Sequence, residues 1–436
     1  MKNIAIIGGG ISGLSAAITL NRNNIDFTLF EATDSVGGAI KTVREFDCII
    51  ECGPNSINGS NDDLKDLINY LELENECCYA NNLSKNRYII KSKYLLPVPL
   101  SFTKFLKTKL FSTQAKLRLI KEPFIKSKST NNESVHDFII RRLGKEILDY
   151  AVSPFIGGIY AGDPKKLSLK KSFPKLSKLE AEYGSIFKGM NKLKRRSSSS
   201  KIYTFKNGMV TLPKKIADHI HKSIKYNSPI EEIIRSDSGN WIINNKEFSH
   251  IILTQPAYTF ADLHAPFDVS IFNKIYYPPV TSINLLYKQT QIEHHLDGFG
   301  ILVPECEKMF ILGVLFPSII FNNRSPENTI LLTVFVGGSI HPERALLSEE
   351  ELIKKIEMDL KTLIKLNGTA INKKCFFWKK AIPQYDMNIY KIHESIEAIE
   401  KENNGLYIIG NYRNGISIPD AVSSGKDTAL RIIESK

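Results

Sequence analysis

The segment Ile4-Ala5-Ile6-Ile7-Gly8-Gly9-Gly10-Ile11-Ser12-Gly13 decides the fold of the N-terminal part of the chain. Its first four residues are apolar and predict a short, buried parallel strand. The glycines that follow have the GxGxxG spacing of a dinucleotide-binding turn. Gly8 permits the tight turn, Gly10 lets the backbone approach a pyrophosphate, and Gly13 lets the next helix pack closely on the strand. The free N–H groups at the start of that helix would hold the phosphates.

The residues after the turn complete a Rossmann-like unit. Residues 14–20 predict a helix and residues 26–30 predict a second strand, which ends at Glu31, 18 residues after Gly13. A carboxylate at this place accepts hydrogen bonds from the adenosine ribose hydroxyls and disfavours a 2′-phosphate. NAD and FAD both fit such a unit. Its predicted cofactor-binding residues are Gly8, Gly9, Gly10, Ile11, Ser12, Gly13, Glu31 and Ala32.

The next segment favours FAD over NAD. Asp34-Ser35-Val36-Gly37-Gly38-Ala39-Ile40-Lys41-Thr42 resembles the paired-glycine segment of the amine oxidase-like FAD proteins. That family usually has Arg before Val-Gly-Gly and a basic residue after it, whereas this chain has Ser35 and Ala39. The backbone of Gly38 and Ala39 is therefore the part expected to contact the pyrophosphate.

FAD folds of this kind are discontinuous, so the C-terminus should complete the site. Residues 406–409 predict a strand that ends in Gly410, and residues 415–420 open a helix. Ser423, Ser424 and Gly425 keep the first turns of that helix small enough for a flavin ring to approach. The predicted cofactor-binding residues here are Gly410, Ile416, Ser417 and Ile418.

The middle of the chain carries a more specific signal. Val152-Ser153-Pro154-Phe155-Ile156-Gly157-Gly158-Ile159-Tyr160-Ala161-Gly162-Asp163-Pro164 resembles the signature of the oxygen-dependent protoporphyrinogen oxidases. The family includes coproporphyrinogen III oxidases, and its neighbours are amine oxidases and carotene desaturases. The resemblance covers essentially the whole chain in order and continues in residues 51–56, 297–300, 313–316, 335–339 and 378–385.

The resemblance implies an α/β fold, α+β overall, in three parts. A Rossmann-like FAD-binding domain would comprise residues 1–84, 202–255 and 371–436. An antiparallel-sheet substrate domain would comprise residues 256–370 with about 85–92, and a helical membrane-binding domain residues 93–201. The implied reaction is the six-electron oxidation of protoporphyrinogen IX to protoporphyrin IX in haem synthesis. FAD accepts two electrons in each of three rounds, and O2 reoxidises it to give hydrogen peroxide.

The resemblance also implies the residues of the site. Arg87 would pair with a substrate carboxylate, for which the guanidinium fork is suited. The residues implied to contact the substrate are Arg87, Asn55, Gly158, Gly162, Ile283, Phe299 and Phe316, and the further cofactor contacts are Gly53, Pro54, Asn55, Ser56, Ile230 and Trp378. No histidine falls in a matched motif, so no general base is assigned. No cysteine or histidine spacing predicts a metal site.

The net charge of +12 is concentrated in one segment. Residues 85–128 carry +11, residues 129–163 carry −2 and residues 164–201 carry +10, so 85–201 carries +19 and the rest of the chain −7. Aromatic and aliphatic residues alternate with the lysines, as an in-plane membrane helix requires. Solvated helix faces around an internal core would give the same composition, and residues 195–200 predict a mobile basic loop. A nucleic-acid groove would also be basic, but no nucleic-acid motif accompanies this charge.

Localisation and partners follow from these observations. The chain lacks an uninterrupted apolar run of spanning length and a signal-peptide pattern, so we expect a cytoplasmic protein on the periphery of an anionic membrane. Its six cysteines are expected to be reduced. The expected partners are the porphyrinogen, O2, ferrochelatase as acceptor of the product, and a second copy in a homodimer, but no nucleic acid. The alternatives are coproporphyrinogen III oxidation, carotene desaturation or amine oxidation, and a non-catalytic flavin-containing module that binds lipid or nucleic acid.

Overall fold

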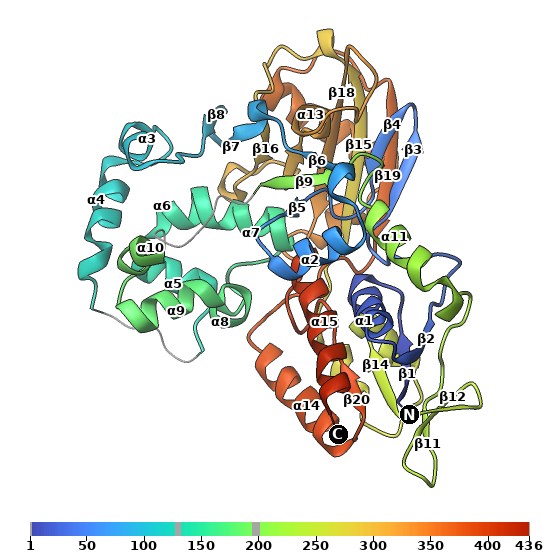
Figure 1. Ribbon diagram of the computed structural model, residues 1–436. Coiled ribbons are helices and arrows are strands. Elements are labelled where there is room, and N and C mark those ends of the chain that lie inside the picture. The colour runs from blue at the N-terminus through green and yellow to red at the C-terminus, as the bar shows by residue number, and fades with distance from the viewer. Residues whose placement is uncertain (1, 127–131, 194–200, 436) are drawn as a thin grey trace.

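A computed structural model describes residues 2–126, 132–193 and 201–435 of the chain (Figure 1). Residues 127–131 and 194–200, which include the whole predicted basic loop 195–200, lie outside the described residues. A five-stranded parallel sheet has the order β10-β2-β1-β14-β20. Its strands are β1 (Asn3–Ile7), β2 (Asp26–Phe30), β10 (Ile224–Lys225), β14 (His250–Leu253) and β20 (Leu406–Ile408). Segments from the start, middle and end of the chain therefore form one sheet.

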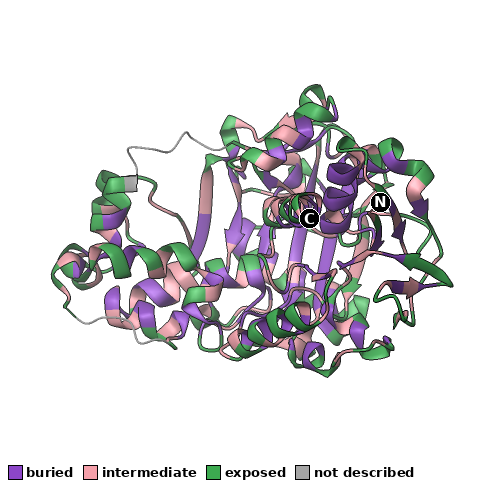
Figure 2. Ribbon diagram, turned by 60° about the horizontal axis from the view of Figure 1, so that its bottom comes forward, coloured by how far each residue is buried: buried purple, intermediate pink, exposed green. Residues whose placement is uncertain are grey.

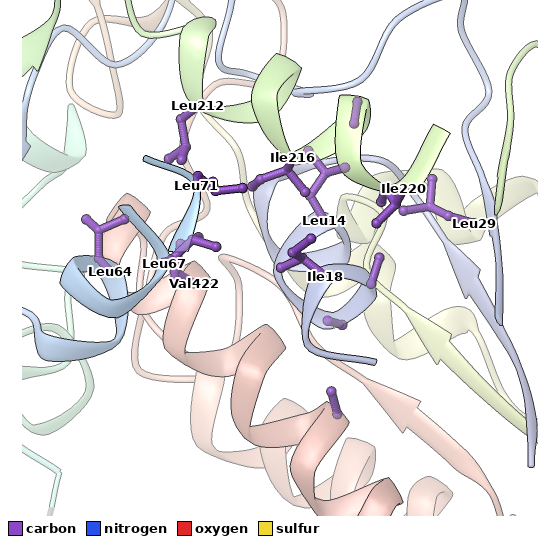
Figure 3. Close-up of a cluster of buried hydrophobic side chains, with 14 of the residues drawn as sticks. Leu14, Ile18, Leu29, Leu64, Leu67, Leu71, Leu212, Ile216, Ile220 and Val422 are labelled. Atoms are coloured by element: carbon purple, nitrogen blue, oxygen red, sulfur yellow. The ribbon is translucent and has the colours of Figure 1, made fainter. Parts of the chain in front are cut away.

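Helices cover both faces of this sheet because its strands are apolar on both sides. Ile4 and Ile6 of β1 point to one face and Ala5 and Ile7 to the other, and each pair belongs to a separate core cluster. The helices are α1 (Ile11–Arg22), α2 (Asp62–Tyr70), α11 (Thr211–Ile220), α14 (Ile389–Glu402) and α15 (Ile418–Glu434). Figure 3 shows Leu14 and Ile18 of α1 packed beside Ile216 of α11 in the first cluster.

A seven-stranded sheet lies beside the parallel one, with the order β19-β15-β18-β17-β16-β7-β8. All its neighbours are antiparallel except β16 and β7. The helix α13 (Glu349–Ile364) packs on one face through a third core cluster. The strands are β7 (Asn86–Lys91), β8 (Tyr94–Pro97), β15 (Val280–Lys288), β16 (Gly298–Leu302), β17 (Gly313–Leu315), β18 (Thr329–Gly337) and β19 (Asn372–Trp378).

The sheets divide the chain differently from the sequence boundaries at two places. β19 was assigned with the cofactor part, yet it pairs along β15. β8 falls in the segment assigned to the helical part, yet it pairs with β7. In both cases long-range strand pairing overrides the local division. The mixed α/β fold itself is as predicted.

Three smaller sheets complete the fold. The hairpin β3–β4 packs Cys48 and Ile50 against Leu286 and Leu331, so it joins the cofactor part to the seven-stranded sheet. The remaining strands are β3 (Thr42–Glu45), β4 (Cys48–Glu51), β5 (Ile57–Asn58), β6 (Cys77–Tyr79), β9 (Ile202–Phe205), β11 (Ile234–Arg235), β12 (Trp241–Ile243) and β13 (Lys246–Phe248).

The segment between β8 and β9 is helical and stands to one side of both sheets (Figure 1). We call residues 98–193, without the undescribed 127–131, the helical insert. It has a hydrophobic cluster of its own, centred on residues such as Phe138, Ile139 and Ile156. Its helices are α3 (Phe102–Lys107), α4 (Thr113–Lys121), α5 (Val135–Arg142), α6 (Lys145–Ile147), α7 (Ser153–Tyr160), α8 (Leu169–Ser172), α9 (Pro174–Tyr183) and α10 (Ile186–Leu193); α12 (Pro317–Ile320) lies outside it.

Candidate active site

The glycine turn leaves open space where a pyrophosphate is expected. Gly8 has a φ of +107°, which favours glycine. A Cβ on Gly13 would lie 2.1 Å from the carbonyl oxygen of Gly8, so this position must stay bare for α1 to pack. A Cβ on Gly10 would meet no atom within 4 Å. Gly13 therefore serves packing, whereas Gly10 leaves room for a ligand.

Glu31 stands at the end of β2 beside this turn. Its Oε2 accepts a hydrogen bond from the backbone N–H of Gly9 at 2.8 Å, and its Oε1 accepts from the backbone and hydroxyl of Thr33. The backbone N–H of Ser228 donates to the carbonyl of Glu31, which brings the loop of Ile230 beside the predicted ribose position. Ile230 lies in this loop and packs partly on the second core cluster.

The paired glycines lie directly against the turn. The N–H of Gly37 donates to the carbonyl of Gly9 at 2.8 Å, and Gly10 and Gly37 form a bridge. The Cβ position of Gly38 is 3.4 Å from the Cα of Gly10. The Cβ position of Gly53 is 2.1 Å from the carbonyl oxygen of Ala39. The structure thus brings the backbones of all these predicted cofactor residues together.

The C-terminal segment meets the N-terminal one where the start of α1 packs against the second and third turns of α15. α1 and α15 pack side by side, and a Cβ on Gly425 would lie 2.2 Å from the carbonyl oxygen of Ser12 (Figure 1). Ser417 caps α15 in a capping box with Asp420. Ile11 and Ile418 are the first residues of the two helices, and Gly410 closely follows β20. Two positive helix ends therefore converge at the carboxyl edge of the parallel sheet, which suits an anionic dinucleotide.

Trp378 holds the segment that was predicted to contact flavin. Its indole N–H donates to the carbonyl of Cys52 at 2.9 Å, and the hydroxyl of Ser282 donates to the same oxygen. The amide of Asn55 donates to the carbonyl of Gly53, in a turn that includes Pro54. The indole N–H of Trp378 thus bonds the backbone of the 52–55 segment, and the indole ring lies beside Gly53.

One row of residues crosses the seven-stranded sheet on the face toward the cofactor segment. Asn284, Thr333, Leu315, Gly300 and Arg87 are register partners on five successive strands. Partners in register project from the same face of a sheet. The first three line a small cavity whose other walls include Asn55, Ser56 and Phe299. The Nδ2 of Asn284 is buried there and has no partner among the described residues.

Arg87 ends this row as an available cation. Its guanidinium carbon lies 5.1 Å from the ring centroid of Phe299. Its side chain makes no ion pair with any described residue, and the neighbouring carboxylate of Asp297 is occupied by Tyr88 and Asn86. Arg87 is half-buried, so a substrate carboxylate would meet a partly desolvated partner.

Two residues implied to contact the substrate face the other way. Ile283 and Phe316 are fully buried in the cluster beneath α13, and neither lines the cavity. Strand alternation explains this for Ile283, because its neighbours Ser282 and Asn284 point to the cofactor side. Those polar residues in an otherwise apolar strand were the sequence signal that was missed.

Gly158 and Gly162 lie where the helical insert meets the sheet and the C-terminal part. A Cβ on Gly158 would lie 2.7 Å from Cδ2 of Leu302, and one on Gly162 would lie 2.7 Å from Oε1 of Gln384. Leu302 follows Gly300 by two residues on β16, so it projects from the same face of the sheet. It is therefore a further candidate for substrate contact, which the sequence reasoning missed.

A buried ion pair forms the inner wall of the cavity. Arg324 lies 3.3 Å from Glu51 and also donates to Thr204 and the carbonyl of Phe205. Burial raises the pKa of Glu51, while the hydrogen bond from Thr42 and the charge of Arg324 oppose that shift. The cation of the cavity wall, Arg324, is thus already paired, whereas Arg87 at the end of the residue row forms no ion pair with any described residue.

Within the described ranges, no group of histidine, cysteine and carboxylate side chains could hold a metal ion. The same ranges contain no helix that is both long and apolar enough to cross a bilayer. All six cysteines are free thiols.

The bare turn, the paired glycines and the two helix ends define a flavin-dependent oxidoreductase with FAD as cofactor. Residues 11–433 match the family of flavin containing amine oxidoreductases. The mitochondrial protoporphyrinogen oxidase of Nicotiana tabacum is 32% identical, over 99% of this chain and 95% of that protein. The chain therefore belongs to the protoporphyrinogen oxidase family within the flavin containing amine oxidoreductases.

Other similar proteins bear on substrate and fold. The coproporphyrinogen III oxidase of Staphylococcus aureus is 28% identical over 99% of each chain. A solved structure from Exiguobacterium sp. 255-15, provisionally assigned as a protoporphyrinogen oxidase, has a TM-score of 0.82 at 23% identity and covers 100% of this chain and 99% of its own. At that identity the likeness shows the fold alone.

Proposed function

We propose that the chain oxidises protoporphyrinogen IX to protoporphyrin IX with O2 as the final acceptor. The observation that carries this proposal is Arg87, a half-buried cation that forms no ion pair with any described residue and lies in register with the cavity row beside an aromatic ring. Protoporphyrinogen is apolar apart from two propionates, so it needs one cation and an otherwise apolar surface. Leu315, Phe299 and Leu302 supply that surface near Arg87.

The residues of the chain would bind and orient the substrate. FAD, when bound, supplies the hydride-accepting chemistry, and the glycine turn, the 37–39 segment and the start of α15 would hold it. Arg87 would fix the propionates, while the apolar side chains exclude water from the reacting carbon. No described histidine reaches the cavity, and pyrrole nitrogens can lose protons to solvent without a base.

The test uses purified holoenzyme with protoporphyrinogen under air. We expect a yellow protein that produces porphyrin fluorescence with O2 uptake. Arg87→Ala should raise KM about ten- to hundredfold with FAD retained, because a charge-assisted hydrogen bond contributes roughly 1.5–3 kcal/mol. Arg44→Ala, which removes an exposed arginine bonded to Asn207, is the matched control. An unchanged KM for the Arg87 variant would reject the anchor, and a protein that cannot bind FAD would reject the function.

Coproporphyrinogen III is the second candidate substrate, favoured by the Staphylococcus aureus and Bacillus subtilis relatives, which are named for it. It carries four propionates, whereas Arg87 offers one cation to the two propionates of protoporphyrinogen. Side-by-side turnover of the two porphyrinogens decides between them: a higher kcat/KM for coproporphyrinogen III would overturn the first proposal.

The helical insert is proposed as the face that rests on an anionic membrane at the cytoplasmic side. Large apolar side chains are exposed beside its lysines: Leu100, Phe102, Leu106, Leu117, Ile120 and Phe124. Apolar side chains would enter the acyl boundary and lysines would meet the head groups. An apolar product released there could pass to ferrochelatase, and light scattering of the holoenzyme would test for the predicted homodimer.

A further inference from the structure

Two adjacent residues, Gln384 and Tyr385, connect the two sides of the candidate site. We call residues 157–162, which are the last turn of α7 and the two residues after it, the substrate loop, and residues 410–418, which lead into α15, the cofactor loop. We propose that Gln384 and Tyr385 are positioning residues that set the distance between these loops and thereby the rate of hydride transfer. The proposal rests on the proposed function, because it assigns the substrate to one loop and the flavin to the other.

Tyr385 holds the cofactor loop through its hydroxyl group. The hydroxyl donates to the carbonyl of Asn411 at 2.6 Å and accepts from the backbone N–H of Gly415 at 2.8 Å. The side chain is buried, and burial raises the pKa of Tyr385 well above its ordinary value. The group therefore stays a neutral hydroxyl that can donate and accept at once. The Tyr385 hydroxyl oxygen thus bonds two backbone groups, four residues apart, in the loop that leads into α15.

Gln384 holds the substrate loop through its side-chain amide. Its Nε2 donates to the carbonyl of Tyr160 at 2.8 Å, and its Oε1 occupies the space beside Gly162. The backbone carbonyl of Tyr385 also accepts from the N–H of Ser168 at 2.8 Å, just beyond the loop. The residue pair therefore bonds the helical insert on one side and the cofactor loop on the other.

The surrounding packing makes this connection stiff. Ala161 of the substrate loop has a φ of +46°, and its carbonyl accepts from the N–H of Ser339 at 2.7 Å. Ile416 of the cofactor loop packs against both the insert cluster and the second core cluster. Both loops are bonded to residues 384–385, and Ser339 holds the substrate loop in addition, so we expect a movement of one loop to reach the other through residues 384–385.

Distance is decisive for this chemistry. Reacting atoms must approach to about 3–3.5 Å, and a displacement of about 1 Å can slow a reaction about a hundredfold. Loss of the Tyr385 hydroxyl would free the cofactor loop but leave the glycine turn and Arg87 in place. We therefore expect slower flavin reduction with retained binding of both FAD and substrate.

The test compares Tyr385→Phe and Gln384→Met with Tyr277→Phe. Tyr277 is a buried tyrosine of the same cluster whose hydroxyl accepts only a 3.3 Å bond from Ala257, outside both loops. In stopped-flow experiments with protoporphyrinogen, each of the first two variants should reduce its flavin at least about tenfold more slowly, with KM changed less than threefold. The double variant should be no slower than the slower single variant, because both act on one distance.

Hydrogen exchange of the holoenzyme gives a readout that does not need the substrate. Tyr385→Phe should speed exchange in the substrate loop as well as the cofactor loop, and Tyr277→Phe should do so in neither. Exchange that rises in the cofactor loop alone, or flavin reduction as fast as in Tyr277→Phe, overturns the proposal. Wild-type enzyme that porphyrinogens do not reduce would instead overturn the proposed function, and the exchange result would still decide whether the loops are coupled.

Discussion

The parallel sheet and the helical insert place charge and apolar surface in opposite ways. Around the sheet, large apolar clusters fill both faces and the glycines allow backbone to pack on backbone. In the insert, Arg142 and Glu122 are completely buried, whereas Phe124 is 79% exposed. Figure 2 shows buried residues concentrated in the strands and many exposed ones along the insert helices. One region is built to enclose a cofactor, the other to present apolar side chains outward.

The buried charges explain how the insert keeps its shape with a small core. Arg142 lies 2.7 Å from Glu180 and 3.4 Å from Glu122, and its guanidinium also donates to the carbonyls of Ile125 and Gly184. Fully paired buried ions specify one arrangement but add little net stability. The insert should therefore be the region that fails first when its charges are unbalanced.

The largest expected effect is on the sheet. Gly13→Val should abolish FAD binding, because its side chain would collide with the carbonyl of Gly8 at the start of α1. Flavin absorbance after purification measures this. Gly10→Ala is the matched variant: its Cβ meets no protein atom, so the apoprotein should unfold at the normal denaturant concentration while FAD binds more weakly. Normal flavin content in Gly13→Val would contradict the assignment of this turn.

The next largest effect is in the insert. Arg142→Leu removes the ion pair of the buried Glu122 and one of the two arginines of Glu180, which keeps Arg141, and should destabilise the insert by about 3–5 kcal/mol. Hydrogen exchange should rise across α5, α9 and α10, while flavin content stays normal. Adding Glu122→Gln should recover part of the loss, because the buried carboxylate that lost its ion pair is then neutral. If exchange rose equally in the parallel sheet, the two regions would not be separate in stability.

The two regions also differ in how much of them the sequence predicts. The glycine turn, its strands and the start of α1 follow from local spacing, whereas the C-terminal residues Gly410 to Ile418 were predicted from the resemblance to discontinuous FAD folds. The face of β15 was assigned to Ile283 by resemblance, whereas alternation places Ser282 and Asn284 there. The pairing of β19 with β15 and the ion pairs of Arg142 join residues far apart in the chain. Such contacts depend on tertiary packing, which no local pattern reveals.

The free energy of unfolding should depend on pH through a histidine where α14 contacts α8 of the insert. His393 of α14 is buried, its Nε2 donates to the carbonyl of Tyr412, and Lys171 of α8 lies 3.0 Å from its Nδ1. Burial, and secondarily the charge of Lys171, lowers the pKa of His393 to about 4, below the 6.5 of an unperturbed histidine. The unfolded chain therefore binds more protons between these values, so stability is complete above pH 6.5 and falls as the pH drops toward 4.

The loss at pH 4 is at most roughly 3 kcal/mol. Urea unfolding of the holoenzyme between pH 4.5 and 7.5 measures it. His393→Gln, which can keep the bond to Tyr412 but cannot take up a proton, should flatten the profile over this range. A profile that keeps its full slope in His393→Gln would assign the pH dependence to other groups.

The smallest expected effect concerns the outer surface of the insert. Phe102 on α3 and Leu346, shortly before α13, are both 65% exposed, but only Phe102 lies among the lysines of the insert. Phe102→Ser should weaken binding to vesicles of anionic lipid about five- to thirtyfold, since removing one partly inserted aromatic side chain loses about 1–2 kcal/mol. Leu346→Ser should leave binding unchanged. Equal weakening by both substitutions would mean that lipid meets the whole protein surface, and no weakening by either would leave the lysines of the insert as its only attachment to the membrane.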